Sequence, residues 1–157
     1  MPDLSMEATI GQLLAVLCEA FEGAERWSYF TDHGADAGLL GTLGKLSAAE
    51  ASRPTGGTTI AAHAHHVVFS LEASSAWIRG DRSRRNWAES WSVTTVDAAA
   101  WARLLEELEK GYRDLRQAIE AHASSSVEAM GGAAGAVAHM AYHLGAIRQK
   151  VAFSRQA

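Results

Sequence analysis

The 157-residue sequence contains a single cysteine, Cys18. One cysteine cannot form a disulfide within the chain, and low cysteine content is typical of a reducing compartment, so we expect a cytoplasmic protein. The sequence also lacks any apolar run near the roughly 18 residues that a membrane span requires. Residues 1–23 lack a basic segment and carry Glu7 and Glu19, which is not the pattern of a signal peptide. We therefore expect no membrane partner.

An excess of positive charge is missing as well, since the formal net charge is −4 at pH 7. The composition gives no general electrostatic reason to expect a nucleic acid as partner. The segment "RGDRSRR", residues 79–85, is locally basic and admits a nucleic-acid-binding interpretation. We favour a solvated loop, because acidic residues dominate elsewhere, and we expect no nucleic-acid partner.

No segment of useful length alternates apolar and polar residues with period two, so a sheet is not expected. Four segments instead repeat their apolar residues at helical spacing. Their stripes are Ile10, Leu13, Leu14, Leu17 and Phe21; Ile60, Ala64, Val67, Leu71 and Ile78; Trp101, Leu104, Leu105, Leu108, Tyr112, Leu115 and Ile119; and Val137, Met140, Leu144, Ile147 and Val151. The sequence predicts an all-α protein, a four-helix bundle formed by one domain over residues 1–157.

The connections indicate how these helices are joined. Residues 23–57 form a long crossover, in which Ser47 and Glu50 have capping-box spacing and predict a short helix before Pro54. Thr58 or Thr59 is expected to cap the second helix, and the last helix is expected after the glycines at 131, 132 and 135. The long crossover indicates that not all neighbouring helices are sequential hairpins.

Five of the seven histidines lie in two clusters. "AVAHMAYHLGAIRQ" places His139 and His143 one helical turn apart, beside the apolar stripe of the last helix. "AAHAHHVVF" holds the other three, on the second helix. There His63 lies roughly 60° from the apolar stripe and His66 roughly 120° from it, while His65 is nearly opposite and is expected to be solvated.

Neutral imidazole is the commonest protein ligand for zinc and also suits nickel, copper and iron. Two imidazoles one turn apart, with a third from a facing helix, would hold an ion and leave a position for water or substrate. The alternative is that these are histidines at the edge of the bundle, bonded to backbone or water. Met140 and Ala141 follow His139 where the H-E-x-x-H motif has its glutamate, which disfavours a metalloprotease.

The segments "TTIAAHAHHVVFSLE" and "AVAHMAYHLGAIRQ" resemble the DinB-like superfamily of bacterial proteins, which includes the YfiT group and mycothiol- and bacillithiol-dependent transferases. The resemblance runs over most of the chain and implies a four-helix bundle with a three-histidine metal site. Carried over, the ligands are His66, His139 and His143. The helical wheel alone leaves His63 as the alternative to His66. Gly145-Ala146-Ile147 departs from the Gly-Gln-Ile of many members without removing a ligand.

The resemblance further implies a divalent metal, nickel or zinc, and a homodimer. It indicates a metal-dependent enzyme that activates water or a low-molecular-weight thiol against a small-molecule substrate, as a thiol S-transferase or a hydrolase. The alternative is a non-catalytic or stress-related helical bundle with a structural metal or none. No catalytic residue is assigned from the sequence.

Two remaining residue types have structural interpretations. Cys18 lies at the edge of the apolar stripe of the first helix and is expected to be a small core-edge residue. Four of the five tryptophans, Trp77, Trp87, Trp91 and Trp101, are expected to pack against the bundle and its long loop, and one of them is a candidate for the wall of a substrate pocket.

Overall fold

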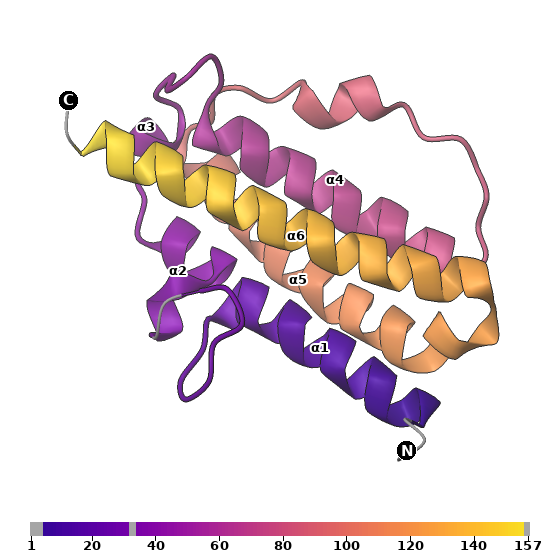
Figure 1. Ribbon diagram of the computed structural model, residues 1–157. Helices are drawn as coiled ribbons and strands as arrows, with labels where there is room; N and C mark the ends of the chain where they lie inside the picture. Colours follow the sequence, from indigo (N-terminus) through magenta and orange to yellow (C-terminus); the bar gives the residue numbers. More distant parts are fainter. Residues whose placement is uncertain (1–4, 32–33, 156–157) are drawn as a thin grey trace.

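A computed structural model describes residues 5–31 and 34–155, and residues 1–4, 32–33 and 156–157 lie outside the described residues. The described chain is all-α, and its four main helices pack together as a bundle (Figure 1). These helices are α1 (Met6–Glu22), α4 (Ile60–Ile78), α5 (Ala98–His122) and α6 (Val127–Ser154). The predicted all-α bundle is confirmed.

The helix ends follow the capping residues of the sequence. Ser5 accepts a hydrogen bond from the Ala8 N–H at the start of α1. Thr59 caps α4 in the same way, as predicted, and Asp97 caps α5. These side-chain oxygens satisfy N–H groups that have no partner within the helix.

The apolar stripes supply the core. Leu17 and Phe21 of α1 are fully buried, and the whole predicted stripe of α4 is buried. The stripes of α5 and α6 are buried too, apart from the half-buried Leu105. The helical periodicity therefore identified the interior face of each main helix.

The crossover between α1 and α4 contains short helical turns, as predicted. They are η1 (Ala35–Ala37), α2 (Leu39–Gly44) and α3 (Ala48–Ala51). Ser47 and Glu50 form the predicted capping box: the Ser47 Oγ accepts from the Glu50 N–H, and the Glu50 carboxylate accepts from the Ser47 N–H. Leu39 and Leu43 of α2 are buried, so the crossover closes one end of the core.

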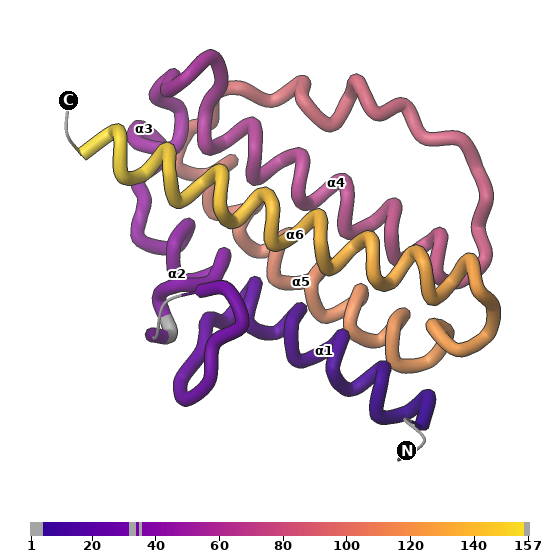
Figure 2. The backbone as a smooth tube through the Cα atoms, in the orientation of Figure 1, coloured from indigo at the N-terminus to yellow at the C-terminus, as the bar shows by residue number. Residues whose placement is uncertain are grey.

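The bundle is not a series of adjacent hairpins. Helix α4 packs against α5 and α6, and α1 also packs against α5 and α6, so the consecutive helices α1 and α4 lie across the core from each other (Figure 2). The long crossover makes this diagonal connection. A second long connection, residues 79–97, runs outside α4 and includes the 3-10 helix η2 (Trp87–Trp91).

The predicted start of the last helix is wrong. Helix α6 begins at Val127, before the three glycines, and Ser126 caps it by accepting from the Ala129 N–H. Ala129 and Ala133 are buried on its first turns. Glycine lowers helix stability by about 1 kcal/mol relative to alanine, and packing of this small-residue face overrides that preference.

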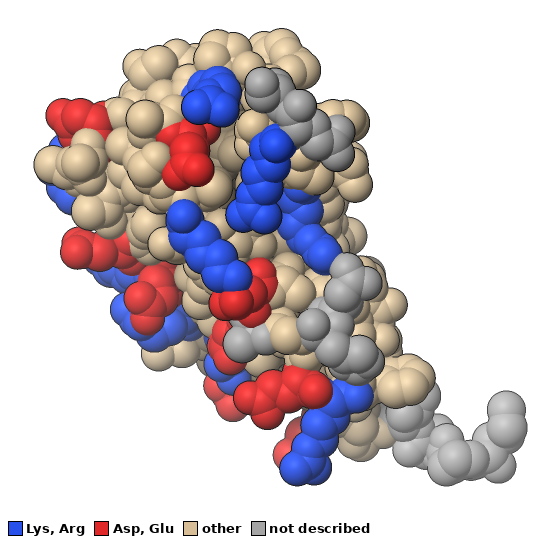
Figure 3. Space-filling view, turned by 90° about the vertical axis from the view of Figure 1, so that its left-hand side faces the viewer, with Lys and Arg blue, Asp and Glu red and all other residues tan. Residues whose placement is uncertain are grey.

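The charged side chains on one face of the surface do not form a large patch of a single sign. Basic and acidic side chains are intermingled on the face shown in Figure 3. Within the part of the chain that the structure describes, no helix is long and apolar enough to cross a membrane.

Candidate metal centre

Three imidazoles converge between α4 and α6. The Nε2 atom of His139 lies 3.1 Å from Nε2 of His66 and 2.9 Å from Nε2 of His143. One ring nitrogen from each of the three side chains lies within 4.8 Å of the other two. The structure thus brings together the three residues that the resemblance implies as ligands.

The positions of the three rings follow from helix geometry. His139 and His143 are one turn apart on α6, so their side chains lie on one face. Helix α4 packs against this part of the bundle and contributes His66, next to the core residue Val67. His66 and His143 are buried and His139 is half-buried, so one side of the cluster remains accessible.

His63, the alternative third ligand, lies behind His143. Its Nδ1 is 3.1 Å from Nδ1 of His143, on the opposite side of that ring from the converging Nε2 atoms. One of the two Nδ1 atoms must carry a proton for this contact to be a hydrogen bond. If His143 donates, its Nε2 keeps a free lone pair, so His63 can fix the tautomer that a metal needs.

Ser90 of η2 fixes the tautomer of His66. The Ser90 hydroxyl donates to the Trp87 carbonyl at 2.7 Å and therefore accepts from the Nδ1–H of His66, also at 2.7 Å. With its proton on Nδ1, His66 directs the lone pair of Nε2 at the cluster. Sequence reasoning missed Ser90, because nothing in the sequence indicates that η2 folds back onto α4.

Burial keeps the imidazoles neutral. Burial, with the neighbouring histidines as a smaller cause, lowers the pKa of His66 to about 4 and that of His143 to about 3. Burial also lowers the pKa of His139. Lone pairs that meet at one point repel each other unless a proton or a cation lies between them. A neutral His139 with its proton on Nε2 can donate to only one of the other two nitrogens at a time, whereas a metal cation accepts all three lone pairs, so a cation suits this donor set.

The spacing of the nitrogens also suits a metal. Tetrahedral zinc with Zn–N bonds of about 2.05 Å holds its nitrogen ligands about 3.3 Å apart. The 2.9 and 3.1 Å separations are within a few tenths of an ångström of that value. Small side-chain movements would therefore complete a three-nitrogen site.

The 3-10 helix η2 covers the cluster from outside. Trp91 stacks on His66 with ring centroids 4.2 Å apart, and it meets the edge of His63 at 5.2 Å. His65 contacts the Ser90 carbonyl through Nδ1 at 2.8 Å and is half-buried, so its predicted solvated position is wrong. The covering loop explains the difference, because it buries a helix face that would otherwise be exposed.

The other tryptophans have different surroundings. Trp101 is buried and donates to the Leu46 carbonyl, as expected for a packing residue. Trp77 and Trp87 remain 42% and 48% exposed, but Trp77 lies against Arg82 and Trp87 against the rings of His66 and Phe69, as expected for residues that pack against the bundle and its loop. Both line a cavity of about 540 Å³ that reaches His139. This agrees with the expectation that a tryptophan walls a pocket.

Comparisons of the chain with protein-family models, curated proteins and solved structures found no match. Three neutral imidazoles, one with its tautomer fixed by Ser90 and one bordering a cavity, form a candidate metal centre with one accessible side.

Proposed function

We propose that His66, His139 and His143 bind one divalent ion, zinc or nickel, and that the protein is a metal-dependent enzyme of the DinB-like type. The observation that carries the proposal is the convergence of three buried or half-buried Nε2 atoms on one point. The N-rich donor set suits zinc and nickel, while calcium and magnesium prefer oxygen ligands.

The cavity beside His139 supports an enzyme more than a structural site. Structural zinc sites are closed by four protein ligands, whereas catalytic sites have three and keep a position for substrate or water. Among the described residues only three converge here. The half-buried third ligand borders a cavity of about 540 Å³, which is of the size that small-molecule sites have.

The bound ion supplies a positive charge that favours ionisation of a thiol or water and polarises an electrophile. The protein's own residues hold and shield it: His63 and Ser90 orient two ligands, and Trp91 excludes water from one side. Asp81, the one carboxylate among the described residues that line the cavity, is already paired with Arg85. Among the described lining residues, no unpaired carboxylate is therefore available as a base, and this favours thiol transfer over hydrolysis because a thiol is far more acidic than water.

In such a transfer, the sulfur of a low-molecular-weight thiol forms a bond to carbon of the small electrophile, and the leaving group departs with the electron pair of the bond that breaks. The thiol proton passes to solvent. We propose, on the same resemblance, that the enzyme is a cytoplasmic, single-domain homodimer with neither nucleic acid nor membrane as partner. Sedimentation analysis at several concentrations tests the dimer.

The metal proposal is tested by titrating metal-free protein with zinc and with nickel against a chromophoric chelator. Wild-type protein is expected to bind one ion per chain, and His66→Ala and His139→Ala are expected to lose most of the affinity. His122→Ala is the matched control, because His122 is an exposed histidine at the end of α5. Equal affinity in the control and the ligand variants would show that the ion binds elsewhere.

The enzymatic proposal is tested separately. Consumption of a thiol such as cysteine in the presence of 1-chloro-2,4-dinitrobenzene is measured for metal-loaded protein, metal-free protein and His139→Ala. Metal-dependent turnover supports the proposal. Tight metal binding without turnover across a panel of thiols and electrophiles favours the alternative, a non-catalytic metal-binding bundle.

A further inference from the structure

The cavity beside His139 is bordered by more positive than negative charge. Its lining includes three arginines, Arg82, Arg84 and Arg85, against one carboxylate, Asp81. All four residues come from the segment that follows α4. The cavity is otherwise lined mainly by small and aromatic side chains of α4, η2 and α6.

The three arginines differ in the groups that their guanidinium groups contact. Arg85 donates to Glu72 at 3.0 Å and to Asp81 at 3.4 Å, so two carboxylates neutralise it. Arg82 lies 3.9 Å above the Trp77 ring and donates to main-chain carbonyls, and its charge helps to lower the pKa values of the Asp81 and Glu128 carboxyl groups. Arg84 is exposed and has no ion pair or hydrogen bond to the described residues. Among the described residues that line the cavity, Arg84 is thus the cation left without an anion.

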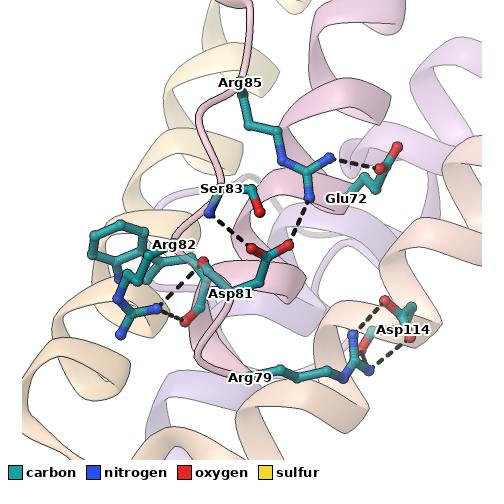
Figure 4. A network of polar contacts seen from close by, with 8 residues as sticks. Glu72, Arg79, Asp81, Arg82, Ser83, Arg85 and Asp114 are labelled. Carbon is teal, nitrogen blue, oxygen red and sulfur yellow. Dashed lines mark hydrogen bonds and ion pairs between the residues drawn. The ribbon is translucent and has the colours of Figure 1, made fainter.

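A network of polar contacts holds this segment in place (Figure 4). Arg79, at the end of α4, forms a two-pronged ion pair with Asp114 of α5, with distances of 2.9 and 2.7 Å. The Asp81 carboxylate accepts from the Ser83 N–H at 2.8 Å and binds Arg85. Because both ends of the short segment are tied to the bundle, Arg84 is presented at the cavity by an ordered loop.

Part of the cavity wall is flat and apolar. Trp77 and Trp87 contribute partly exposed indole rings. On the side of α6, Gly132 is in close contact with Trp77, and Gly135 leaves open space where a side chain would stand. An aromatic or other flat apolar group can stack on such rings, while an anionic group would bind an arginine through charge-assisted hydrogen bonds.

We propose that this cavity binds a small anionic molecule with a flat apolar body, such as an aromatic carboxylate, with Arg84 as its main anion contact. The inference rests on the proposed function in one respect: the ligand would be the electrophilic substrate, held beside the ion at His139. The binding chemistry itself needs only the cavity, the two indoles and the unpaired arginine.

The test uses 2-naphthoate and its neutral analogue 2-naphthamide as probes. Calorimetric titrations are carried out on metal-free and on zinc-loaded protein, and the indole N–H signals of Trp77 and Trp87 in NMR spectra locate the probe. Wild-type protein is expected to bind the carboxylate about tenfold more tightly than the amide, as one charge-assisted hydrogen bond implies. Arg84→Gln is expected to abolish that preference.

Two matched controls accompany these variants. Arg103→Gln removes an exposed arginine of α5 that has no described partner, and it should leave the preference unchanged. Gly135→Leu fills the cavity and should weaken binding of both probes. Gly145→Leu introduces the same side chain on the same helix, also into open space but away from the cavity lining. It should leave the binding of both probes unchanged.

Equal binding of the acid and the amide, or equal effects of the two arginine variants, would overturn the inference. So would indole signals that do not move when 2-naphthoate binds. Zinc binding in protein that does not select the carboxylate would refute this inference and leave the proposed metal site intact. Carboxylate selection in protein that binds no zinc or nickel would refute the proposed function and leave the anion site.

Discussion

His63 contacts the Nδ1 atom of His143 and is not one of the three histidines whose ring nitrogens converge. With His143 as the donor in this contact, His63 would hold that ring in the tautomer and orientation that a metal needs. We expect His63→Ala to weaken zinc binding about 10- to 100-fold, the range typical of residues that orient metal ligands. His63→Gln, whose amide oxygen accepts a hydrogen bond, should restore part of the affinity.

The measurement is a competition titration with a chromophoric chelator, with His122→Ala as control. A merely structural role for His63 predicts loss of folded protein without selective rescue by glutamine. Unchanged zinc affinity in folded His63→Ala would contradict the positioning role.

A second residue-scale prediction concerns the buried carboxylate of Glu19. It accepts hydrogen bonds from the N–H groups of Tyr29, Phe30 and Thr31 at 2.7, 2.9 and 2.7 Å, and so ties the following loop to α1. The amide group of Glu19→Gln must place its NH2 against one of these donors. We expect a loss of about 1–3 kcal/mol in the free energy of unfolding. Urea denaturation measures it, with the exposed Glu7→Gln as control.

The same carboxylate gives a pH dependence. Burial alone would raise the pKa of Glu19, but hydrogen bonds from Phe30, Thr31, Tyr29 and Ser28 lower it to about 2. A depressed pKa in the folded state contributes stability above the unfolded value, near 4.5, and this contribution is lost as the pH falls toward 2. The stability gap between wild type and Glu19→Gln should therefore narrow between pH 5 and pH 3. A constant gap would contradict this assignment.

Of the candidate site, the sequence revealed the histidines but not their environment. Helical spacing placed His139 and His143 together, because one helix fixes that relation. The choice between His63 and His66 depends on how α4 is rotated against α6, which a helical wheel does not contain. The contacts of Ser90 and Trp91 with the histidines could not be predicted for a similar reason. Both residues belong to a loop whose path over α4 is set by tertiary contacts.

At the scale of elements, Gly132 of α6 lies directly against the side chains of Trp77 and Ile78 of α4. A Cβ atom at this position would stand 2.6 Å from Cδ1 of Trp77, too close without movement of the indole. Gly131, the preceding residue on the same helix, has open space there. Gly131→Ala should raise stability by up to about 1 kcal/mol through helix propensity. Gly132→Ala should be less stable than Gly131→Ala by about 1–3 kcal/mol.

Thermal and urea denaturation of the two alanine variants compare their stabilities, and tryptophan fluorescence reports the movement of Trp77. Equal stability with unchanged fluorescence would mean that the approach of the two helices tolerates the extra methyl group.

Most helix bounds and buried faces followed from the sequence because caps and apolar periodicity are local signals. Ser47, Glu50 and Thr59 acted as their sequence context predicts. The start of α6 did not follow from the sequence, because three nearby glycines locally disfavour a helix. Burial of Ala129 and Ala133, together with the close contact at Gly132, overrides that signal only in the assembled bundle.

At the scale of the whole molecule, metal binding should be coupled to folding. The three ligands come from α4 and α6, so the site forms only when these helices are packed. An ion that binds the folded state alone raises stability by about 2.7 kcal/mol at a concentration one hundred times its dissociation constant. Zinc should therefore raise the melting temperature of the wild type and not that of His139→Ala.

The same calorimetric scans test the expected single domain, which predicts one cooperative transition whose calorimetric and van't Hoff enthalpies agree. Two transitions would show that part of the chain unfolds separately. A zinc effect of equal size in wild type and His139→Ala would place the ion at another site.

The most direct test of the central claim is native mass spectrometry of the wild type and His143→Ala after metal removal and incubation with one equivalent of zinc per chain. His143→Ala removes one converging nitrogen, and circular dichroism verifies that its helices remain. The three-histidine site predicts one zinc ion per wild-type chain and an empty variant. Equal zinc occupancy in both proteins would contradict it.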